Sequence, residues 1–447
     1  MLNRRHFLGS IALPSAAVLT AFARSTRGAG VLDLDAWRDS LDAVADTPGD
    51  PKAIAFDETF WAPAQQAFAI DRSMINLNNG GVSPAPRVVL EAQRRYTDHA
   101  NTAPSYVLWR LQEPQRESVR EAVATHWGVS AEEIAFTRNA SESLQICQSG
   151  LDLKPGDEVV TTTQDYPRML STFRQLERRN GVKLVLIKLP IPCENDDLVV
   201  ERFAEAITPR TKMILMSHVI NITGQILPVK KVVEMARSKN GGVPVIVDGA
   251  HAFAHLNYKL SDLGCDFYGV SLHKWLFAPH GTGLLYVRRE KIKNLWPLMA
   301  AKPEQDNDIR KFEEIGTHAA APVLCVAEAL AFHQTIGDAR KEARMRFLRD
   351  YWAQRLISAS SASAHPVILH TSLDPRFSCG IGTFQLKGID SANIGIELWE
   401  RHKIHVTVVK HDEFEGVRVT PSIYTQLEEL DRFVAAVQHI MKDGLAA

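Results

Sequence analysis

The chain has 447 residues, of which 45% are hydrophobic and 23% are charged, and its formal net charge is −1 at pH 7. This length exceeds what one compact core organises, so two domains, or one large and one small, are expected. The balanced charge gives no reason to expect nucleic acid or an anionic membrane surface as a partner. Five scattered cysteines, without a CxxC pair, argue against a disulfide scaffold and a cysteine zinc site.

The N-terminus has the pattern of a signal peptide. Asn3-Arg-Arg-His-Phe-Leu-Gly9 precedes a short apolar run, Ile11 to Ala23, which ends in a small-residue cleavage candidate. The run is too short for a comfortable membrane span, so no stable anchor is expected after cleavage. The paired arginines resemble the twin-arginine type, which implies the twin-arginine export machinery as a partner and a periplasmic or exported protein. A basic, frayed N-terminus is the alternative, and residues 1–29 are set apart from the fold.

Residues 30–84 form a predicted N-terminal segment with helical patches and a glycine turn. The turn, Asn76-Leu-Asn-Asn-Gly-Gly-Val-Ser-Pro84, can bring backbone N–H groups close to a ligand, although a plain loop would look the same. The predicted large domain, residues 85–335, begins with helix-period apolar spacing over residues 85–128, which Pro104 and Pro114 interrupt.

The remainder of the large domain is predicted to be α/β. From Ile134 onward, short β-rich runs alternate with longer amphipathic stretches, which is typical of βαβ units. Several runs are apolar throughout, as in strands that are buried on both faces. The pattern predicts a mostly parallel sheet covered by helices on both faces, with strands at Glu158–Thr163, Lys183–Lys188, Lys212–Ser217, Val243–Asp248 and Asp266–Ser271.

The C-terminal residues, 336–447, predict a smaller α+β domain. A helical pattern over roughly 323–360 contains the boundary between the two domains. The elements expected after it are strands near 366–370 and 380–386, a helix around 390–402, a strand at 404–409 and a terminal helix near 425–442.

Lys274 stands where the strand at Asp266–Ser271 ends, with His273 before it and bulky aromatic residues after it. A lysine at the carboxyl edge of a buried strand loses hydration, which lowers its pKa and frees the amine as a nucleophile. Taken alone, a surface lysine where a strand meets solvent is an equally good interpretation.

Other strand ends carry polar motifs, and in open α/β sheets ligands bind outside the carboxyl ends of the strands. The motifs are Gln164-Asp-Tyr-Pro167, Ser217-His-Val-Ile-Asn221 and Asp248-Gly-Ala-His251. In addition, Thr137-Arg-Asn-Ala-Ser-Glu-Ser143 opens a helix whose N–H groups suit a phosphate. A reactive lysine, a buried aspartate, a stacking aromatic and a phosphate pocket together fit pyridoxal phosphate. Singly, each motif has a structural explanation as a turn, a core residue or a helix cap.

Rival interpretations are weaker. Gly269-Val-Ser-Leu-His273 half-matches the nucleophile elbow of serine hydrolases, but a histidine replaces the second glycine. His251 and His255 lie four residues apart, yet the glutamate of a HExxH motif is missing, so no metal site is expected. A non-catalytic binding protein that keeps the fold is a further alternative, against which the intact Lys274 and Asp248 argue.

Together the motifs resemble the class-V aminotransferase family of fold-type I pyridoxal-phosphate enzymes, over essentially all of the mature sequence. The resemblance implies a large α/β domain and a smaller α+β C-terminal domain. The motifs that carry it are Thr137-Arg-Asn-Ala-Ser-Glu142, Leu153-Lys-Pro-Gly-Asp157, Ser217-His-Val-Ile-Asn-Ile-Thr-Gly224, Val247-Asp-Gly-Ala-His251, Ser271-Leu-His-Lys274, Gly316-Thr317 and Arg418-Val-Thr-Pro421.

The resemblance implies roles toward the cofactor. Lys274 would bind pyridoxal phosphate as a Schiff base and would move protons, while Asp248 would pair with the pyridine nitrogen. His251 would lie near the ring's 3-oxygen, and Tyr166 would stack on the ring, with Asp165 as the alternative by one position. The remaining implied contacts are Asn221 with the cofactor and Ala140, Ser141, Ser271 and His273 with its phosphate.

The resemblance also implies substrate contacts and a second subunit. Arg418 would bind the α-carboxylate of an amino-acid substrate in a bidentate manner, which suits its planar fork. Asn79, in the turn over residues 78–80, would close over the substrate. Thr317 resembles a residue that a second subunit lends to the phosphate, which implies a homodimer.

One departure from the family pattern narrows the chemistry. Cysteine desulfurases of this class carry a nucleophilic cysteine shortly before the carboxylate-binding arginine, and residues 408–418 contain none. The residue patterns at 77–81 and 101–110 resemble those of the isopenicillin N epimerase-like branch. Epimerase or aminotransferase chemistry at the α-carbon is therefore expected, with a C–S or β-elimination lyase as the alternative.

Overall fold

The computed structural model describes residue 44 and residues 47–239, 241–361 and 363–446. The predicted signal peptide, residues 1–29, lies outside these residues. Within the described part of the chain, no helix is long and apolar enough to cross a membrane.

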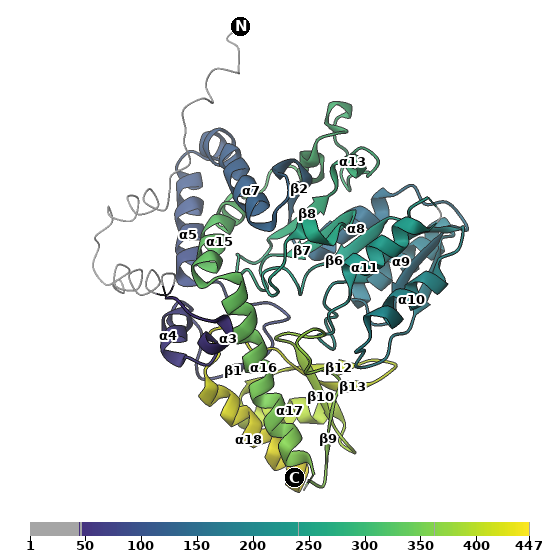
Figure 1. The fold of residues 1–447 in the computed structure, drawn as a ribbon. Coiled ribbons are helices and arrows are strands. Elements are labelled where there is room, and N and C mark those ends of the chain that lie inside the picture. The colour runs from purple at the N-terminus through teal and green to yellow at the C-terminus, as the bar shows by residue number, and fades with distance from the viewer. Residues whose placement is uncertain (1–43, 45–46, 240, 362, 447) are drawn as a thin grey trace.

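The larger part of the molecule is built on a seven-stranded sheet with the order β2-β8-β7-β6-β5-β3-β4. β3 to β7 run parallel to one another, whereas β8 is antiparallel to both of its neighbours, β7 and β2. The predicted mostly parallel α/β sheet is therefore confirmed (Figure 1). The strands are β2 (Ile134–Thr137), β3 (Glu158–Thr162), β4 (Lys183–Ile187), β5 (Thr211–Ser217), β6 (Val245–Asp248), β7 (Phe267–Ser271) and β8 (Gly283–Val287).

Helices cover both faces of this sheet because the strand side chains alternate between two apolar cores. On β5, Met213 and Leu215 pack with residues of α8 and α9, while Ile214 and Met216 pack with residues of α10 and α11. Strands buried on both faces need apolar residues at successive positions, which explains their continuous hydrophobic runs. These helices are α8 (Ala140–Gly150), α9 (Pro167–Asn180), α10 (Asp196–Ala206) and α11 (Val229–Ser238).

The helical region before the sheet is more continuous than predicted. Pro114 does not interrupt it, because this proline lies in the first turn of α7, where its missing N–H costs no hydrogen bond. Pro104 starts a new helix after a break at Ala103. The helices are α3 (Pro51–Ile54), α4 (Glu58–Gln66), α5 (Arg87–Thr102), α6 (Pro104–Tyr106), the π-helix η2 (Val107–Gln112) and α7 (Glu113–Trp127).

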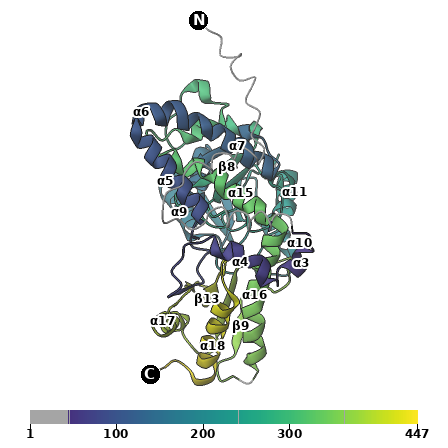
Figure 2. The ribbon, with the colours of Figure 1, turned by 90° about the vertical axis from the view of Figure 1, so that its left-hand side faces the viewer.

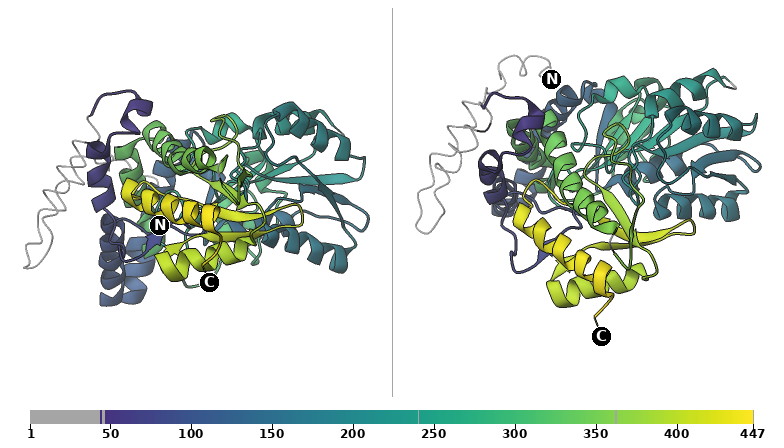
Figure 3. Two further views of the ribbon diagram at one scale, coloured as in Figure 1. Left: turned by 90° about the horizontal axis from the view of Figure 1, so that it is seen from below. Right: turned by 60° about the horizontal axis from the view of Figure 1, so that its bottom comes forward.

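The C-terminal part contains a second, four-stranded antiparallel sheet with the order β12-β13-β10-β9. Trp352 of α16, Phe384 of β10 and Phe433 of α18 form its core in mutual ring contact. Figure 2 shows this part below the larger sheet, and Figure 3 shows it in front when seen from below. Its strands are β9 (Val367–Leu369), β10 (Gly382–Leu386), β12 (Thr407–Lys410) and β13 (Glu415–Val419), and its helices are α16 (Asp338–Ser360), α17 (Ser391–His402) and α18 (Leu427–Asp443).

Three details differ from the predicted elements of this part. The helix predicted over 323–360 is broken at Gly337, whose φ of +88° favours glycine, so that α15 (Val326–Ile336) ends before α16 begins. The strand predicted at 404–409 is two strands, β11 (Ile404–His405) and β12. The strand β13 carries Arg418 and was not predicted.

The N-terminal segment joins the two parts. Phe60 and Trp61 of α4 belong to the core of the larger part, whereas Ile75 and Leu77 belong to the C-terminal core. β1 (Ile75–Asn76) pairs in parallel with β11, so the turn that follows it is held beside the C-terminal sheet. The remaining short elements are η3 (Ala131–Glu133), α12 (Leu260–Leu263), α13 (Arg289–Ile292), η4 (Pro303–Gln305), η5 (Ile309–Glu313) and α14 (Ala321–Leu324).

Candidate active site

Lys274 lies in the connection between β7 and β8, directly beyond the carboxyl end of the sheet. Its Nζ is 3.1 Å from Nε2 of His251. Burial lowers the pKa of Lys274 to about 8, an effect that nearby Asp248 opposes and nearby Arg418 reinforces. The amine is therefore much more easily deprotonated than that of an ordinary surface lysine.

Asp248 is the last residue of β6 and lies beside Ser217 of β5 and Gly269 of β7. Its Oδ1 accepts a hydrogen bond of 2.9 Å from the backbone N–H of Ala250. Burial raises the pKa of Asp248 to about 6, against the opposing effects of that hydrogen bond and of Lys274. A buried carboxylate with such a raised pKa is stabilised in its charged form by a cationic partner, such as a protonated pyridine nitrogen.

His251 is buried, and burial, reinforced by Lys274, holds its pKa well below the usual range. The ring is therefore neutral at pH 7. One ring nitrogen contacts Lys274, while Nδ1 is buried and has no partner among the described residues. A buried polar atom without a partner is costly, so this nitrogen is a contact point for a bound polar group.

The structure separates the roles of Asp165 and Tyr166. The buried Asp165 carboxylate accepts hydrogen bonds from the side chains of Thr161, Thr162 and Ser217 and from two backbone N–H groups, so it is fully engaged within the protein. Tyr166 precedes the first residue of α9, and its side chain is 40% exposed. Its phenol is close enough to Arg418 to affect the pKa of that guanidinium. Tyr166 is thus the residue of this pair that a ligand can contact.

The predicted phosphate residues come together at the N-terminus of α8. The backbone N–H of Ala140 donates to Oγ of Ser271 at the end of β7, over 2.9 Å. β8 passes close to this helix start because Gly283 has no side chain: a Cβ there would lie 2.5 Å from the backbone nitrogen of Asn139. Ser141 occupies the first turn of the helix. The first turn of a helix concentrates N–H groups and favours an anion.

His273 follows Ser271 by two residues, on the Lys274 connection. Its Nδ1 is 3.1 Å from the carbonyl oxygen of Thr282, and burial lowers its pKa to about 4. Its own carbonyl oxygen accepts from the backbone N–H of Ser83, which ties the glycine turn to this connection. His273 is therefore a neutral hydrogen-bonding group rather than a cation at pH 7.

Arg418 projects from β13 toward the turn after β1. Its Nη1 donates to the carbonyl oxygen of Asn221 and its Nη2 donates to Oδ1 of Asn78, each over 2.9 Å. Burial lowers the pKa of Arg418 to about 10, and its Nε has no partner among the described residues. No carboxylate of the described chain forms an ion pair with this buried cation, which leaves it suited to a carboxylate from a ligand.

The structure places Asn78, rather than the predicted Asn79, where a side chain of this turn can contact a substrate. The Asn79 amide donates to the carbonyl oxygens of Asn76 and Thr420, and its Oδ1 accepts from the hydroxyl of Tyr424. Because these contacts engage the whole amide, Asn79 fixes the turn rather than facing a ligand. Asn78 is the side chain that contacts Arg418.

Two residues at the site were missed from the sequence. Thr407 of β12 donates to Oδ1 of Asn78 over 2.5 Å and so fixes the amide that faces Arg418. Trp275, which directly follows Lys274, stacks on His255 with ring centroids 4.2 Å apart. The run of aromatic residues after Lys274 indicated Trp275, whereas nothing in the sequence around Thr407 indicated its contact with Asn78.

The arrangement fits pyridoxal phosphate. Three buried polar atoms without partners, Nδ1 of His251, Oδ1 of Asn221 and Nε of Arg418, belong to residues that already lie near Lys274 or near one another. The cofactor offers a phosphate for the α8 N-terminus, a pyridine nitrogen for Asp248 and an aldehyde for the amine of Lys274. The same residues would be poorly satisfied by an apolar ligand.

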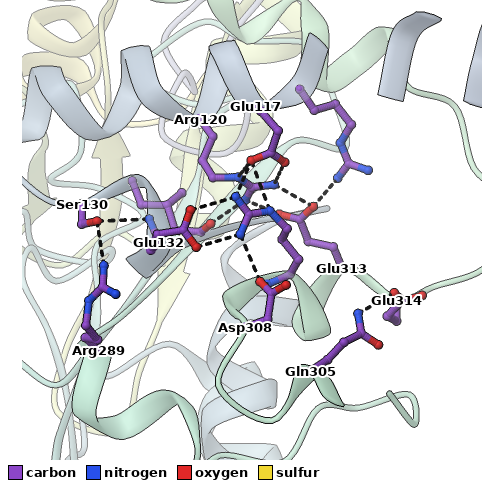
Figure 4. Close-up of polar contacts among 12 residues, drawn as sticks. Glu117, Arg120, Ser130, Glu132, Arg289, Gln305, Asp308, Glu313 and Glu314 are labelled. Carbon is purple, nitrogen blue, oxygen red and sulfur yellow. Dashed lines mark hydrogen bonds and ion pairs between the residues drawn. The ribbon is translucent and has the colours of Figure 1, made fainter. Parts of the chain in front are cut away.

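Thr317 lies apart from these residues. It lines a cavity of about 450 Å³ together with residues of η2, α7 and η5, and none of the other predicted cofactor residues lines that cavity. The Thr317 segment follows a network of ion pairs centred on Glu313, whose carboxylate accepts from Arg116, Arg120 and the backbone N–H of Phe136. Figure 4 shows Glu313 beside Arg120 and Glu117 in this network. Arg116 also reaches His318, the residue after Thr317.

The segment that precedes Arg418 is anchored on the larger sheet. Glu413 accepts hydrogen bonds from the hydroxyl of Thr163 and the amide of Gln164, over 2.7 and 3.3 Å. His411 contacts the carbonyl oxygen of Thr163. All five cysteines of the chain are buried elsewhere, and none lies in this segment.

Comparison with known proteins identifies the family and the fold of this chain. The family described as Aminotransferase class-V matches residues 75–433. The isopenicillin N epimerase of Streptomyces clavuligerus is 30% identical over 395 residues, which cover 84% of this chain and 97% of that protein. The isopenicillin N epimerase of Amycolatopsis lactamdurans is 31% identical over 405 residues, which cover 86% and 99%. The apo structure of a cysteine desulfurase from Thermococcus onnurineus has a TM-score of 0.72 at 23% identity, covers 84% of this chain and 97% of its own, and supports the fold.

Proposed function

Since the chain belongs to the class-V aminotransferase family and is a pyridoxal-phosphate-dependent enzyme, we propose that it acts at the α-carbon of an amino-acid substrate. The observation that carries this proposal is that Lys274, a half-buried and easily deprotonated lysine, lies near Arg418, a buried arginine that has no carboxylate partner among the described residues. The lysine supplies a base, and the arginine supplies a site for the substrate carboxylate. An amino acid satisfies both.

The residues divide the work between binding and proton transfer. Bound pyridoxal phosphate supplies an electron sink for the α-carbon of an amine joined to it. Lys274 would hold the cofactor, and its neutral amine would take up the α-proton of a bound substrate. Asp248 would stabilise a positive charge at the pyridine nitrogen, and Arg418 would hold the substrate carboxylate and so orient the substrate toward Lys274.

Return of the proton decides the product. Delivery of a proton to the face of the α-carbon opposite Lys274, from a donor other than Lys274, would invert the amino acid. Aminotransferase chemistry would follow if no proton returned to the α-carbon. The identity of 30–31% to two isopenicillin N epimerases over nearly their whole lengths favours inversion. Loss of a β-substituent, as in a C–S lyase, is the alternative outcome. The lack of a cysteine in residues 408–418 disfavours the persulfide chemistry of a desulfurase.

The assembly that we propose is a homodimer. Within one chain, Ser271 and the start of α8 form the phosphate site, and Thr317 does not contribute to it because it lines a separate cavity. A second copy that brings its Thr317 to this phosphate site would complete the set of contacts. Sedimentation of the loaded protein and a Thr317→Ala variant with weaker cofactor retention test this arrangement.

We also propose export through the twin-arginine pathway. The support is the Arg4-Arg5 pair followed by a short apolar run. The exported protein would reach the periplasm or the exterior of the cell. Replacing both arginines by lysine should retain the protein in the cytoplasm. Unchanged export of that variant would refute this localisation.

The reaction is tested by exchange at the α-carbon. The purified, cofactor-loaded protein is incubated in deuterium oxide with a panel of amino acids, and each is scored for deuterium, inverted product, keto acid and sulfide. A true substrate should gain deuterium at its α-carbon, and Lys274→Ala should abolish that gain. The absence of exchange for every amino acid of the panel would count against the proposed reaction.

A further inference from the structure

A cluster of metal-ligating side chains lies away from the active site, where three helices meet. His126 is in the last turn of α7, His333 is in α15 and Asp338 is the first residue of α16. Their ligand atoms all lie within 4.8 Å of one another. Nε2 of His126 is 3.2 Å and Nε2 of His333 is 2.6 Å from Oδ1 of Asp338.

The packing around the cluster fixes both imidazole rings with Nε2 toward the carboxylate. Nδ1 of His126 is 3.3 Å from the amide of Gln334, and Nδ1 of His333 is 3.4 Å from Nζ of Lys341. Trp127 stacks on the His333 ring at 6.1 Å between centroids. These contacts hold the two rings in place, and Gln334 can turn its amide oxygen toward Nδ1 of His126 when Nε2 binds an ion.

The cluster is reachable from solvent on one side. The His333 side chain is 1% exposed, whereas those of His126 and Asp338 are 12% and 22% exposed. An ion could therefore enter past Asp338 and could keep a water molecule on its open side. An entry path and an open position are both needed for a site that exchanges metal.

We propose that His126, His333 and Asp338 bind a divalent transition-metal ion, with Zn²⁺ as the best match. Two imidazole nitrogens and one carboxylate oxygen are ligands that Zn²⁺ accepts, whereas Mg²⁺ and Ca²⁺ prefer oxygen. Tetrahedral bonds of about 2.0–2.2 Å place ligand atoms about 3.4 Å apart. The separation of His126 and Asp338 already matches that spacing, and the His333 contact has only to lengthen by a side-chain adjustment.

This site is distinct from the proposed reaction and does not depend on it. Lys341 links the site to the Lys274 connection, because its Nζ contacts Nδ1 of His333 and also donates to the carbonyl oxygen of Trp275. The ligands come from positions 126, 333 and 338, so no short spacing motif in the sequence indicates them.

The test uses the cofactor-loaded protein, stripped with a chelator and then titrated calorimetrically with Zn²⁺. One ion should bind per chain at this site, and His126→Ala or Asp338→Asn should weaken that binding at least about 100-fold. His439→Ala is the matched control. His439 pairs with Asp443 over 3.0 Å on α18, but both are exposed and no third ligand joins them. Its binding curve should equal that of the wild type.

A second measurement separates ligand loss from misfolding. His126→Gln keeps a polar side chain at a partly exposed position, and its melting temperature without metal should stay close to that of the wild type. With Co²⁺ in place of Zn²⁺, the wild type should show the visible bands of a tetrahedral ion, and the variant should lack them. Absence of Zn²⁺ binding in the wild type would overturn the proposal, as would binding that His126→Ala and Asp338→Asn leave unchanged.

Discussion

Nζ of Lys274 lies 3.1 Å from Nε2 of His251, whose other ring nitrogen is buried and has no partner in the part of the chain that the structure describes. The pair places a neutral imidazole directly beside the amine of Lys274. A neutral ring can accept a hydrogen bond from the amine at Nε2 and still offer a hydrogen bond at Nδ1. The rest of the site is arranged around this pair.

We expect His251→Ala to slow α-proton exchange about 100-fold, because a positioned proton-transfer partner contributes at least that much. The variant should still bind the cofactor, since Lys274 and the start of α8 are unchanged. The measurement is deuterium exchange at saturating substrate, with absorbance as the check on cofactor content. The exposed His280 on the same connection offers a control, because His280→Ala should exchange at the wild-type rate.

The pKa of Lys274 predicts how the cofactor-free protein takes up pyridoxal phosphate. Only the neutral amine reacts, and its pKa is lowered to about 8, so the uptake rate should rise with pH and level off above about pH 8. Borohydride trapping at each pH measures the reaction. A midpoint near 10.5, the ordinary lysine value, would show that burial does not act as described.

Asp248→Asn should stabilise the cofactor-free protein while weakening cofactor binding. Burial raises the pKa of the folded carboxyl to about 6, so the folded state binds its proton more tightly than the unfolded state does. Stability from this proton is complete below the unfolded pKa of 3.8 and is lost as the pH rises through 6. At pH 7, the neutral amide should therefore raise the free energy of unfolding by about 1–3 kcal/mol.

Urea unfolding of the cofactor-free variant at pH 7 and pH 4 measures this difference. The gain should shrink at pH 4, where the wild-type carboxyl is already protonated in the folded state. The loaded variant should behave in the opposite way, since an amide does not stabilise a protonated pyridine nitrogen. An equal gain at both pH values would contradict the explanation by proton binding.

Arg418→Lys should lower kcat/KM by about 30-fold, which corresponds to about 2 kcal/mol. A lysine keeps the charge but loses the planar fork that binds a carboxylate at two points. The same substitution should have little effect on an amine substrate that lacks the α-carboxylate. A similar loss for both compounds would assign Arg418 to the structure of the turn through Asn78 and Asn221 rather than to the substrate.

Glu313→Gln should lower the free energy of unfolding by about 3–5 kcal/mol, because Arg116 and Arg120 would lose their shared buried anion. The matched control is Glu205→Gln, whose partner Arg202 and own side chain are both about half exposed. This exposed pair should contribute less than about 1 kcal/mol. Equal effects of the two variants would argue against the buried network as the support of the Thr317 segment.

The sequence by itself determined the fold class, most strands of the larger sheet and the cofactor, and it indicated Lys274 as the candidate for cofactor attachment. These follow from local signals: continuous apolar runs predict strands buried on both faces, and polar motifs after those runs predict a ligand edge. The three differences in the C-terminal part arose where the local sequence of a segment did not reveal which other segments pair or pack with it. β13, for example, is a strand because β10 and β12 pair with it, and this holds although it carries a buried arginine.

Only the tertiary structure decided which side chains face the site. Asp165 and Tyr166 are adjacent in the sequence, but five donors from β3, its loop and Ser217 draw Asp165 inward and leave Tyr166 for a ligand. Asn78 and Asn79 divide in the same way, because Tyr424 and Thr420 engage only the second amide. The direction of a side chain depends on partners that are distant in the chain, and a single sequence does not reveal where those partners meet.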